Sequence, residues 1–213
     1  MVTTTMTAKD LHDILSKLSP NRPVFHSEAD FQHALAWAIH ERYPDARIRL
    51  EYRVPDITET IYLDILVELS GVRIGIELKY KTREWIGDFS EEPFALKNQS
   101  AHPLGRHDFI KDVTRLEQFA RDISKGFAIF LTNCPLYWTE VQNKKTVDAQ
   151  FRLHEGVVLK GTRKWVGSPA KGTTAGRNKP LKLKGEYPLH WQDYSAEAEE
   201  FKYLLLSVPP GSP

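Results

Sequence analysis

The sequence is poor in cysteine and has no long apolar run. Its single cysteine among 213 residues, Cys134, excludes an intramolecular disulfide framework and a zinc site built from several cysteines. No stretch approaches the roughly 18 consecutive apolar residues that a membrane span requires, so we expect no membrane partner. The first residues, MVTTTMTAKD, lack the basic and apolar regions of a secretory signal, and we therefore expect a cytoplasmic protein.

Several common catalytic motifs are also missing. The sequence contains no GxSxG, Walker or GxGxxG pattern, which excludes the usual forms of α/β-hydrolases, P-loop proteins and Rossmann folds. Eight histidines are present, but no His-x(3)-His pair stands beside an acidic third ligand. A helical zinc site is therefore not expected.

The net charge of +1 hides an uneven distribution. The segment from Lys160 to Glu186 carries eight basic residues and one acid, a net +7, so the rest of the chain carries −6. The glycines and prolines between residues 167 and 176 predict a mobile loop. Such a basic segment suits contacts with phosphate groups, and a solvated surface loop is the alternative interpretation.

The apolar periodicity predicts a mixed α/β sheet domain. The expected elements are helices over 8–18, 27–43 and 108–124 and strands over 47–54, 61–69, 72–80, 126–132 and 201–208. A long loop is expected to reach about Arg106. We expect a single domain over 1–213, with a core over 27–132 and a C-terminal extension over 135–213 that contains the basic loop 160–186.

Residues 61–80, IYLDILVELSGVRIGIELKY, alternate so regularly that they predict a β-hairpin with one aliphatic face. That face is expected to hold Ile61, Leu63, Ile65, Val67 and Leu69 of the first strand and Val72, Ile74, Ile76 and Leu78 of the second. A two-residue turn at Ser70-Gly71 pairs residue i with residue 141 − i, which places Asp64 opposite Glu77 on the polar face. Lys79 lies two residues further along that face.

The strand before the hairpin adds a third acid. Its apolar residues alternate with charged ones over 47–54. If Val54 pairs with Ile61 across the connection, Glu51 falls beside Asp64. A plain strand-surface charge is the alternative interpretation of Glu51.

The chemistry of these acids favours a metal site. Two carboxylates opposed on a strand pair repel each other, and Lys79 together with a divalent cation would offset that repulsion. Mg²⁺, for which we expect Mn²⁺ to substitute, typically binds one or two carboxylates together with phosphate oxygens and water. Asp64, Glu77 and Glu51 are the predicted ligands, and the predicted chemistry is metal-dependent hydrolysis of phosphodiester bonds.

A known family shares this arrangement. The pattern of Asp64, twelve residues, and then Glu77-Leu78-Lys79 resembles the PD-(D/E)xK signature of restriction-endonuclease-like nucleases. The expected order of a helix, a three-stranded meander, a helix and a strand is similar to the αβββαβ core of that family. The resemblance covers about residues 27–132.

The resemblance implies a role for each matching residue. Asp64 and Glu77 would be metal ligands, Lys79 the catalytic lysine, and Glu28 the additional glutamate that the first core helix often supplies. Leu63 stands where the family name has proline, a departure that concerns no catalytic group. The alternatives are a solvated, charge-paired strand face and, for Glu28, an acid favoured by the start of a helix.

The partner expected from this interpretation is nucleic acid, with DNA as the substrate and RNA left open. The basic side chains expected to contact it are Lys81, Arg106, Arg115, Arg163, Lys164, Lys171, Arg177 and Lys179. For Arg115, a surface ion pair with Asp112 is the simpler alternative. The competing function is a catalytically inactive scaffold that binds nucleic acid or protein, and a homodimer is compatible with either.

Overall fold

A computed structural model describes residues 5–55, 61–119 and 123–209 of the chain. The helices and strands, in chain order, are α1 (Ala8–Leu18), α2 (Glu28–Arg42), β1 (Arg47–Arg53), β2 (Tyr62–Leu69), β3 (Val72–Lys81), β4 (Trp85–Phe89), β5 (Glu92–Leu96), α3 (His102–Gln118), β6 (Lys125–Thr132), the 3-10 helix η1 (Ala149–Phe151), β7 (Val158–Arg163), α4 (Lys171–Thr174), β8 (Leu181–Pro188), β9 (Trp191–Ser195) and β10 (Phe201–Val208). No helix in these described parts is long and apolar enough to cross a membrane.

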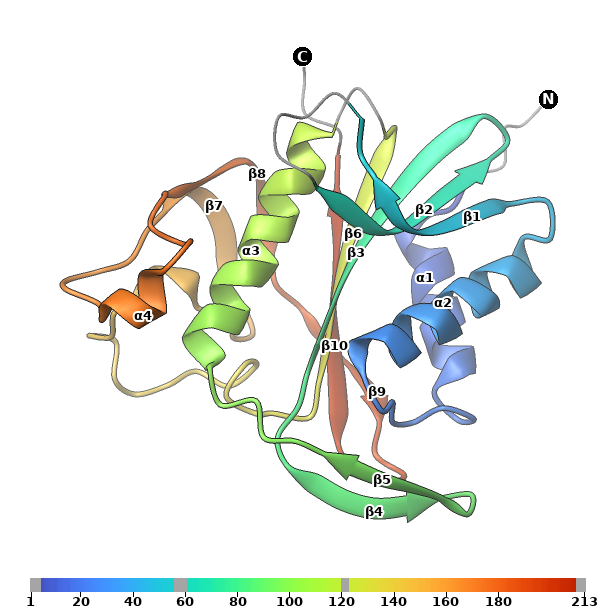
Figure 1. The fold of residues 1–213 in the computed structure, drawn as a ribbon, viewed down its shortest axis with the longest axis horizontal. Helices are drawn as coiled ribbons and strands as arrows, with labels where there is room; N and C mark the ends of the chain where they lie inside the picture. The colour runs from blue at the N-terminus through green and yellow to red at the C-terminus, as the bar shows by residue number, and fades with distance from the viewer. Residues whose placement is uncertain (1–4, 56–60, 120–122, 210–213) are drawn as a thin grey trace.

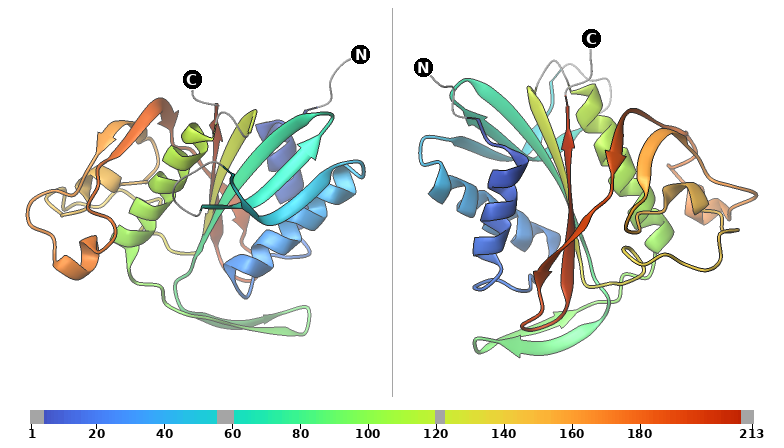
Figure 2. Two further views of the ribbon diagram at one scale, coloured as in Figure 1. Left: turned by 45° about the horizontal axis from the view of Figure 1, so that its top comes forward. Right: turned by 180° about the vertical axis from the view of Figure 1, so that it is seen from behind.

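Six strands form one mixed sheet in the order β1-β2-β3-β6-β10-β9 (Figure 1). Only β3 and β6 pair in parallel, and the other neighbours are antiparallel. Helices α1 and α2 cover one face, while α3 and the small β7–β8 sheet lie on the other (Figure 2). The predicted α/β class is therefore confirmed, and β9 and β10 of the C-terminal extension belong to the same sheet as the core strands.

Two hydrophobic clusters lie on opposite faces of this sheet. The first joins α1, α2 and alternate residues of β3, among them Ile74, Ile76 and Leu78. The second joins α3 to the inner residues of β7 and β8, such as Leu159 and Leu183. Each face of the central strands is thus buried, which explains why the β6 sequence is almost uniformly apolar.

Local signals in the sequence set the boundaries of the first two helices. Thr7 and Asp10 form a capping box at the start of α1. Ser27 caps α2, because its side chain accepts a hydrogen bond from the backbone N–H of Asp30 at 3.1 Å. The predicted starts of both helices are therefore confirmed.

The predicted registers of the strand meander are confirmed as far as the strand pairing extends, but the predicted Asp64–Glu77 pair lies beyond the last pair of the hairpin, Ile65–Ile76. Ser70 and Gly71 both have positive φ, 50° and 80°, as a two-residue hairpin turn with the twist of its strands requires. The pairing that follows, from Leu69–Val72 to Ile65–Ile76, has the predicted sum of 141. Strand β1 pairs with β2 in the predicted register, and the N–H of Val54 donates to the carbonyl of Ile61 at 3.0 Å.

The prediction of one continuous aliphatic face is wrong at its beginning. Ile61 and Leu63 pack in the second cluster, whereas Ile65 and the following odd residues of β2 pack in the first. The change of face falls where Glu51, which stands opposite Asp64 in the register, has a positive φ of 47°. This backbone irregularity interrupts the alternation of both strands at the candidate site.

Three other predictions need correction. The expected loop before Arg106 contains the β4–β5 hairpin, and α3 begins earlier, at His102, with a proline in its first turn. Helix α3 ends at Gln118 and not at residue 124, since Phe119 already has a non-helical φ and ψ. The basic segment 160–186 is not a loop throughout, because its two ends belong to β7 and β8, which pair with each other, and α4 lies between them.

Candidate active site

The site lies where β2 and β3 part. The ladder between them ends at Ile65–Ile76, and β3 continues beyond that point (Figure 1). The next two backbone N–H groups on that edge of β3 are bound by carboxylates: Leu78 donates to Asp64 Oδ2 at 2.5 Å and Tyr80 donates to Glu28 Oε2 at 2.7 Å. Asp64 and Glu28 therefore take the positions that strand carbonyls would otherwise occupy, which brings two predicted site residues to one strand edge.

Glu77 is the most deeply buried predicted acid. Its exposed fraction is 3%, and its Oε1 has no hydrogen-bond partner among the described residues. Burial raises the pKa of Glu77 well above its usual range, and the negative charges of Asp112 and Asp64 raise it further. An acid in this state binds either a proton or a cation.

Asp64 has a related but smaller shift. Burial raises its pKa to about 6, although the hydrogen bond from Leu78 N–H and the charge of Lys79 act in the opposite direction. The charges of Asp112 and Glu28 add to the increase. Four carboxylates and one ammonium group thus influence one another at the end of the β2–β3 ladder.

Lys79 is held by Asp112, which was not among the predicted site residues. Its Nζ lies 2.7 Å from Asp112 Oδ2 and donates to the carbonyl oxygen of Leu78 at 2.9 Å. Burial alone would lower the pKa of Lys79, but the carboxylates of Asp112 and Glu28 outweigh it and raise that pKa. Lys79 is therefore an ammonium ion at neutral pH.

Asp112 projects from α3 and is 3% exposed. Its second oxygen accepts from Arg115 at 3.1 Å, so the predicted Arg115–Asp112 ion pair exists but is not a surface pair. A signal for this burial was in the sequence: Phe109, Asp112, Val113 and Leu116 have the spacing i, i+3, i+4 and i+7 of an apolar helical stripe. An aspartate on such a stripe needs a buried partner, which Lys79 supplies.

Glu51 does not join the other acids as a ligand. It lies beside Asp64 in the register as predicted, but its exposed side chain accepts from Gln32 Nε2 at 2.8 Å. The same Gln32 nitrogen donates to the backbone carbonyl of Asp64 at 2.7 Å. Within the described ranges no three His, Cys, Asp or Glu side chains form a group that could hold a metal ion, so the predicted trio of Asp64, Glu77 and Glu51 is not assembled.

The remaining pair fits a hard divalent cation by its chemistry. Mg²⁺ is usually bound by one or two carboxylates, with waters and substrate phosphates completing its shell. Asp64 and Glu77 supply two carboxylates whose charges act on each other, and the unpartnered buried Oε1 of Glu77 needs a positive partner. A metal would therefore rely on these two residues together with water and substrate.

Two of the arginines predicted to contact phosphates form hydrogen bonds within the protein instead. Arg106 is 3% exposed, pairs with Asp148 at 2.6 Å and donates to the carbonyl of Leu136, so the prediction that it contacts nucleic acid is wrong. Arg163 folds back on its own segment, where its guanidinium donates to the carbonyls of Lys160, Gln150 and Val158.

The other predicted basic residues are accessible to different extents. Arg177 forms a bidentate ion pair with Asp108, and both hydrogen bonds are 2.7 Å long. Lys81 is half-buried at the end of β3. Lys164, Lys171 and Lys179 are exposed.

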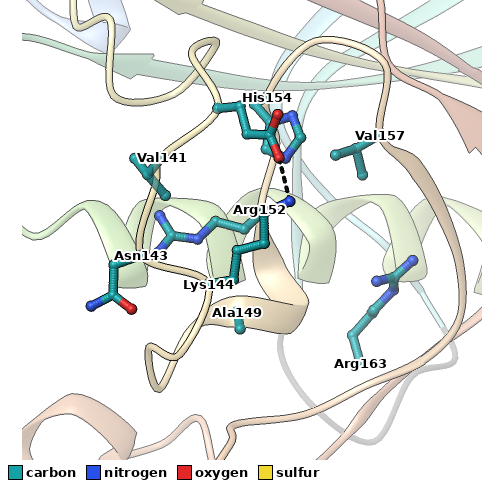
Figure 3. Close-up of a pocket in the computed structure, with 9 residues that line it drawn as sticks. Val141, Asn143, Lys144, Ala149, Arg152, His154, Val157 and Arg163 are labelled. Atoms are coloured by element: carbon teal, nitrogen blue, oxygen red, sulfur yellow. Dashed lines mark ion pairs between the residues drawn. The ribbon is translucent and has the colours of Figure 1, made fainter.

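Arg163 also lines a small hollow of about 220 Å³ in the C-terminal extension, shown in Figure 3. Arg152, Lys144 and His154 lie together on its other side, and Lys144 pairs with Glu140 at 2.9 Å. None of the predicted catalytic acids lines this hollow. It is thus separate from the candidate active site.

No protein-family model matches this chain, and neither curated proteins nor solved structures show significant similarity to it. A functional assignment therefore has to come from the geometry and chemistry of the chain's own residues.

The raised pKa of Asp64 predicts a pH-dependent stability. The folded state holds this proton up to about pH 6, whereas the unfolded state releases it near 3.8, so the unfolding free energy falls as the pH rises between these values and stays low above them. Without metal, Asp64→Asn should therefore be more stable than the wild type at pH 7.5, by about 1–3 kcal/mol. At pH 3 the two should be nearly equal.

Urea unfolding over this pH range measures the effect, with Asp88→Asn as a matched control because Asp88 is an exposed aspartate on β4. The control should change stability by less than about 0.5 kcal/mol at every pH. A wild type that is more stable than Asp64→Asn at pH 7.5 would contradict the assigned burial cost.

Proposed function

We propose that the chain is a Mg²⁺-dependent nuclease with a restriction-endonuclease-like core that hydrolyses phosphodiester bonds in DNA. Support comes from the order α2, β1, β2, β3, α3, β6, which matches the αβββαβ core of that family apart from the β4–β5 hairpin inserted before α3. The observation that carries the proposal is the buried, unpartnered Oε1 of Glu77 next to Asp64, with Lys79 following on the same strand.

Asp64 and Glu77 are the residues that would bind the cation, which would polarise the scissile phosphate and lower the pKa of an attacking water. The hydrogen bond from Leu78 N–H fixes the Asp64 carboxylate, so its orientation does not depend on the metal. Glu28 is fixed in the same way by Tyr80 N–H and adds negative charge beside Asp64.

Lys79 acts through its positive charge. Because its pKa is raised, it does not accept a proton from water at neutral pH; it stabilises the negative charge that develops on the phosphate. Asp112 positions this ammonium group, and Arg115 fixes Asp112 in turn. Two residues of α3 therefore orient the ammonium group of Lys79 on β3.

A scaffold that binds nucleic acid without cutting it is the second candidate function. One observation favours it: the ammonium group of Lys79 is already engaged by Asp112, as in a purely structural ion pair. This candidate predicts salt-sensitive binding that persists in EDTA and in Asp64→Asn.

Cleavage of supercoiled plasmid and of labelled single-stranded DNA, each with Mg²⁺, with Mn²⁺ and with EDTA, tests the proposal. Wild type and the Asp88→Asn control should cleave with either metal and not in EDTA. Asp64→Asn should remain folded and lose about 10³-fold in rate, which corresponds to about 4 kcal/mol of transition-state stabilisation. Equal cleavage by wild type and Asp64→Asn would refute the proposed site, and binding without cleavage under every condition would favour the scaffold.

A further inference from the structure

A positively charged cleft of about 660 Å³ lies between α3 and residues 176–182 of the C-terminal extension. Lys111 and Arg115 line one side, and Arg177, Lys179 and Lys182 line the other. No acidic side chain is among the described residues that line it. The cleft thus gathers part of the basic segment that the sequence marks as distinctive.

Not all of these charges are neutralised within the protein. Arg177 is paired with Asp108 and Arg115 with Asp112. Lys111, Lys179 and Lys182, in contrast, make no ion pair with any residue that the structure describes. The cleft therefore has three cationic side chains available for an anionic ligand, and phosphate groups are such ligands.

The two walls are held together independently of any ligand. Glu117 of α3 is buried, and its carboxylate accepts hydrogen bonds from the backbone N–H groups of Lys184 and Gly185 and from the hydroxyl of Tyr187, at 2.7–3.0 Å. These contacts attach β8 to α3. The cleft is consequently preformed, which lowers the entropic cost of binding.

His107 gives the cleft a polar atom of fixed direction. It is 1% exposed, and its ring stacks on Trp165 at 5.6 Å and meets Phe151 edge-on at 5.1 Å. Its Nδ1 lies 3.2 Å from Asp108 Oδ1, whereas its Nε2 has no partner among the described residues. The buried Nε2 is therefore a polar atom at the wall of the cleft that no described residue satisfies.

Three lysines and an unpartnered ring nitrogen together suit a ligand that has phosphate groups and a hydrogen-bonding ring. A nucleotide strand offers both, since its bases carry hydrogen-bond donors and acceptors. The volume is that of a small-molecule site. Both strands of a duplex do not fit, because its major groove alone is about 12 Å wide and about 8.5 Å deep.

We propose that this cleft binds a single strand of nucleic acid, with Lys111, Lys179 and Lys182 on its phosphates and His107 toward a base. This proposal extends the proposed nuclease function and depends on it, because the strand bound in the cleft would be the substrate of the active site. Arg115 lines the cleft and contacts Asp112, which contacts Lys79, at 3.1 Å and 2.7 Å. The wall of the cleft is therefore two side-chain contacts away from the catalytic lysine.

Fluorescence anisotropy with a labelled single-stranded DNA of mixed sequence and with its duplex, both in EDTA, tests the cleft without cleavage. The variant is Lys179→Gln/Lys182→Gln. The matched control is Lys17→Gln/Lys97→Gln, which removes the same charge from exposed positions that neither line the cleft nor belong to the predicted nucleic-acid contacts. The cleft variant should bind the single strand at least about tenfold more weakly and lower the slope of log K against log salt by about 1.4. The control should lose less than about twofold.

Three results would overturn the proposal: equal weakening by both double variants, tighter binding of the duplex than of the single strand, or displacement of the strand by millimolar inorganic phosphate. Absence of single-strand binding by the wild type would also overturn it. The outcome for the nuclease proposal is distinguishable from this one. Binding through the cleft without any cleavage would refute only the nuclease activity. A protein that cleaves but shows no difference between the double variants refutes only the cleft.

Discussion

Glu77→Gln should abolish metal-dependent cleavage while leaving the fold more stable than the wild type in the absence of metal. The substitution keeps the shape of the side chain and removes the charge that burial opposes, as the strongly raised pKa of Glu77 indicates. Cleavage should fall by about 10³-fold or more, because one of two metal-binding carboxylates is lost. Cleavage rates with Mg²⁺ and urea unfolding in EDTA measure the two effects on one protein.

Measuring cleavage and stability on the same variant distinguishes a catalytic acid from a structural one. Glu68→Gln is the matched control, since Glu68 lies on the same hairpin but its carboxylate is half-exposed and pairs with Arg73. It should retain full cleavage and change stability by less than about 1 kcal/mol. A Glu77→Gln protein that cleaves normally, or that unfolds more easily than the wild type without metal, would show that Glu77 is only a structural residue.

Asp112→Ala should destabilise the protein by about 3–5 kcal/mol, because it leaves the ammonium group of Lys79 buried without its main partner. Arg115 loses its partner in the same variant. Urea unfolding at pH 7.5 gives the size of the effect. Asp13→Ala, which removes an exposed ion-paired aspartate of α1, should cost less than about 1 kcal/mol.

The double variant Lys79→Met/Asp112→Leu separates charge burial from packing. It removes both charges and keeps apolar volume, so it should recover most of the stability lost in Asp112→Ala while remaining inactive. A double variant that is as unstable as Asp112→Ala would show that the loss arises from packing. An active double variant would remove Lys79 from the proposed mechanism.

Much of the candidate site could be predicted because it depends on short-range geometry. A period of two along the strands and a two-residue turn fix the register of the hairpin up to Ile65–Ile76, one pair short of Asp64 and Glu77, whose charges act on each other. Helix caps are a second local signal, and they set the starts of α1 and α2 at Thr7 and Ser27. Each of these signals lies within a few residues of the element that it defines.

The parts that could not be predicted depend on contacts distant in the chain. Asp112 reaches Lys79 only because α3 crosses the sheet between β3 and β6, and Arg106 is buried because Asp148 lies beside it in space. The positive φ of Glu51 ends the alternation of β1 although its neighbours in the sequence continue it. Periodicity could identify Asp112 as inward-facing, but it could not name the partner.

The basic segment shows the same limit. Its composition predicts that the entire segment contacts phosphates. In the fold, however, Lys164 and Lys171 lie outside the cleft, whereas Lys179 and Lys182 line it. The division depends on Glu117, which attaches β8 to α3. Which half of the segment contacts a ligand is therefore a property of the tertiary structure.

The proposed nuclease activity depends on binding of a divalent cation by Asp64 and Glu77 together. Calorimetric titration of Mn²⁺ into the protein at pH 7.5, with and without single-stranded DNA, measures this binding. We expect saturable binding by the wild type and by Glu51→Gln, whose carboxylate is held by Gln32, and its loss in both Asp64→Asn and Glu77→Gln. Equal Mn²⁺ binding by all four proteins, or no binding by the wild type in either condition, would contradict it.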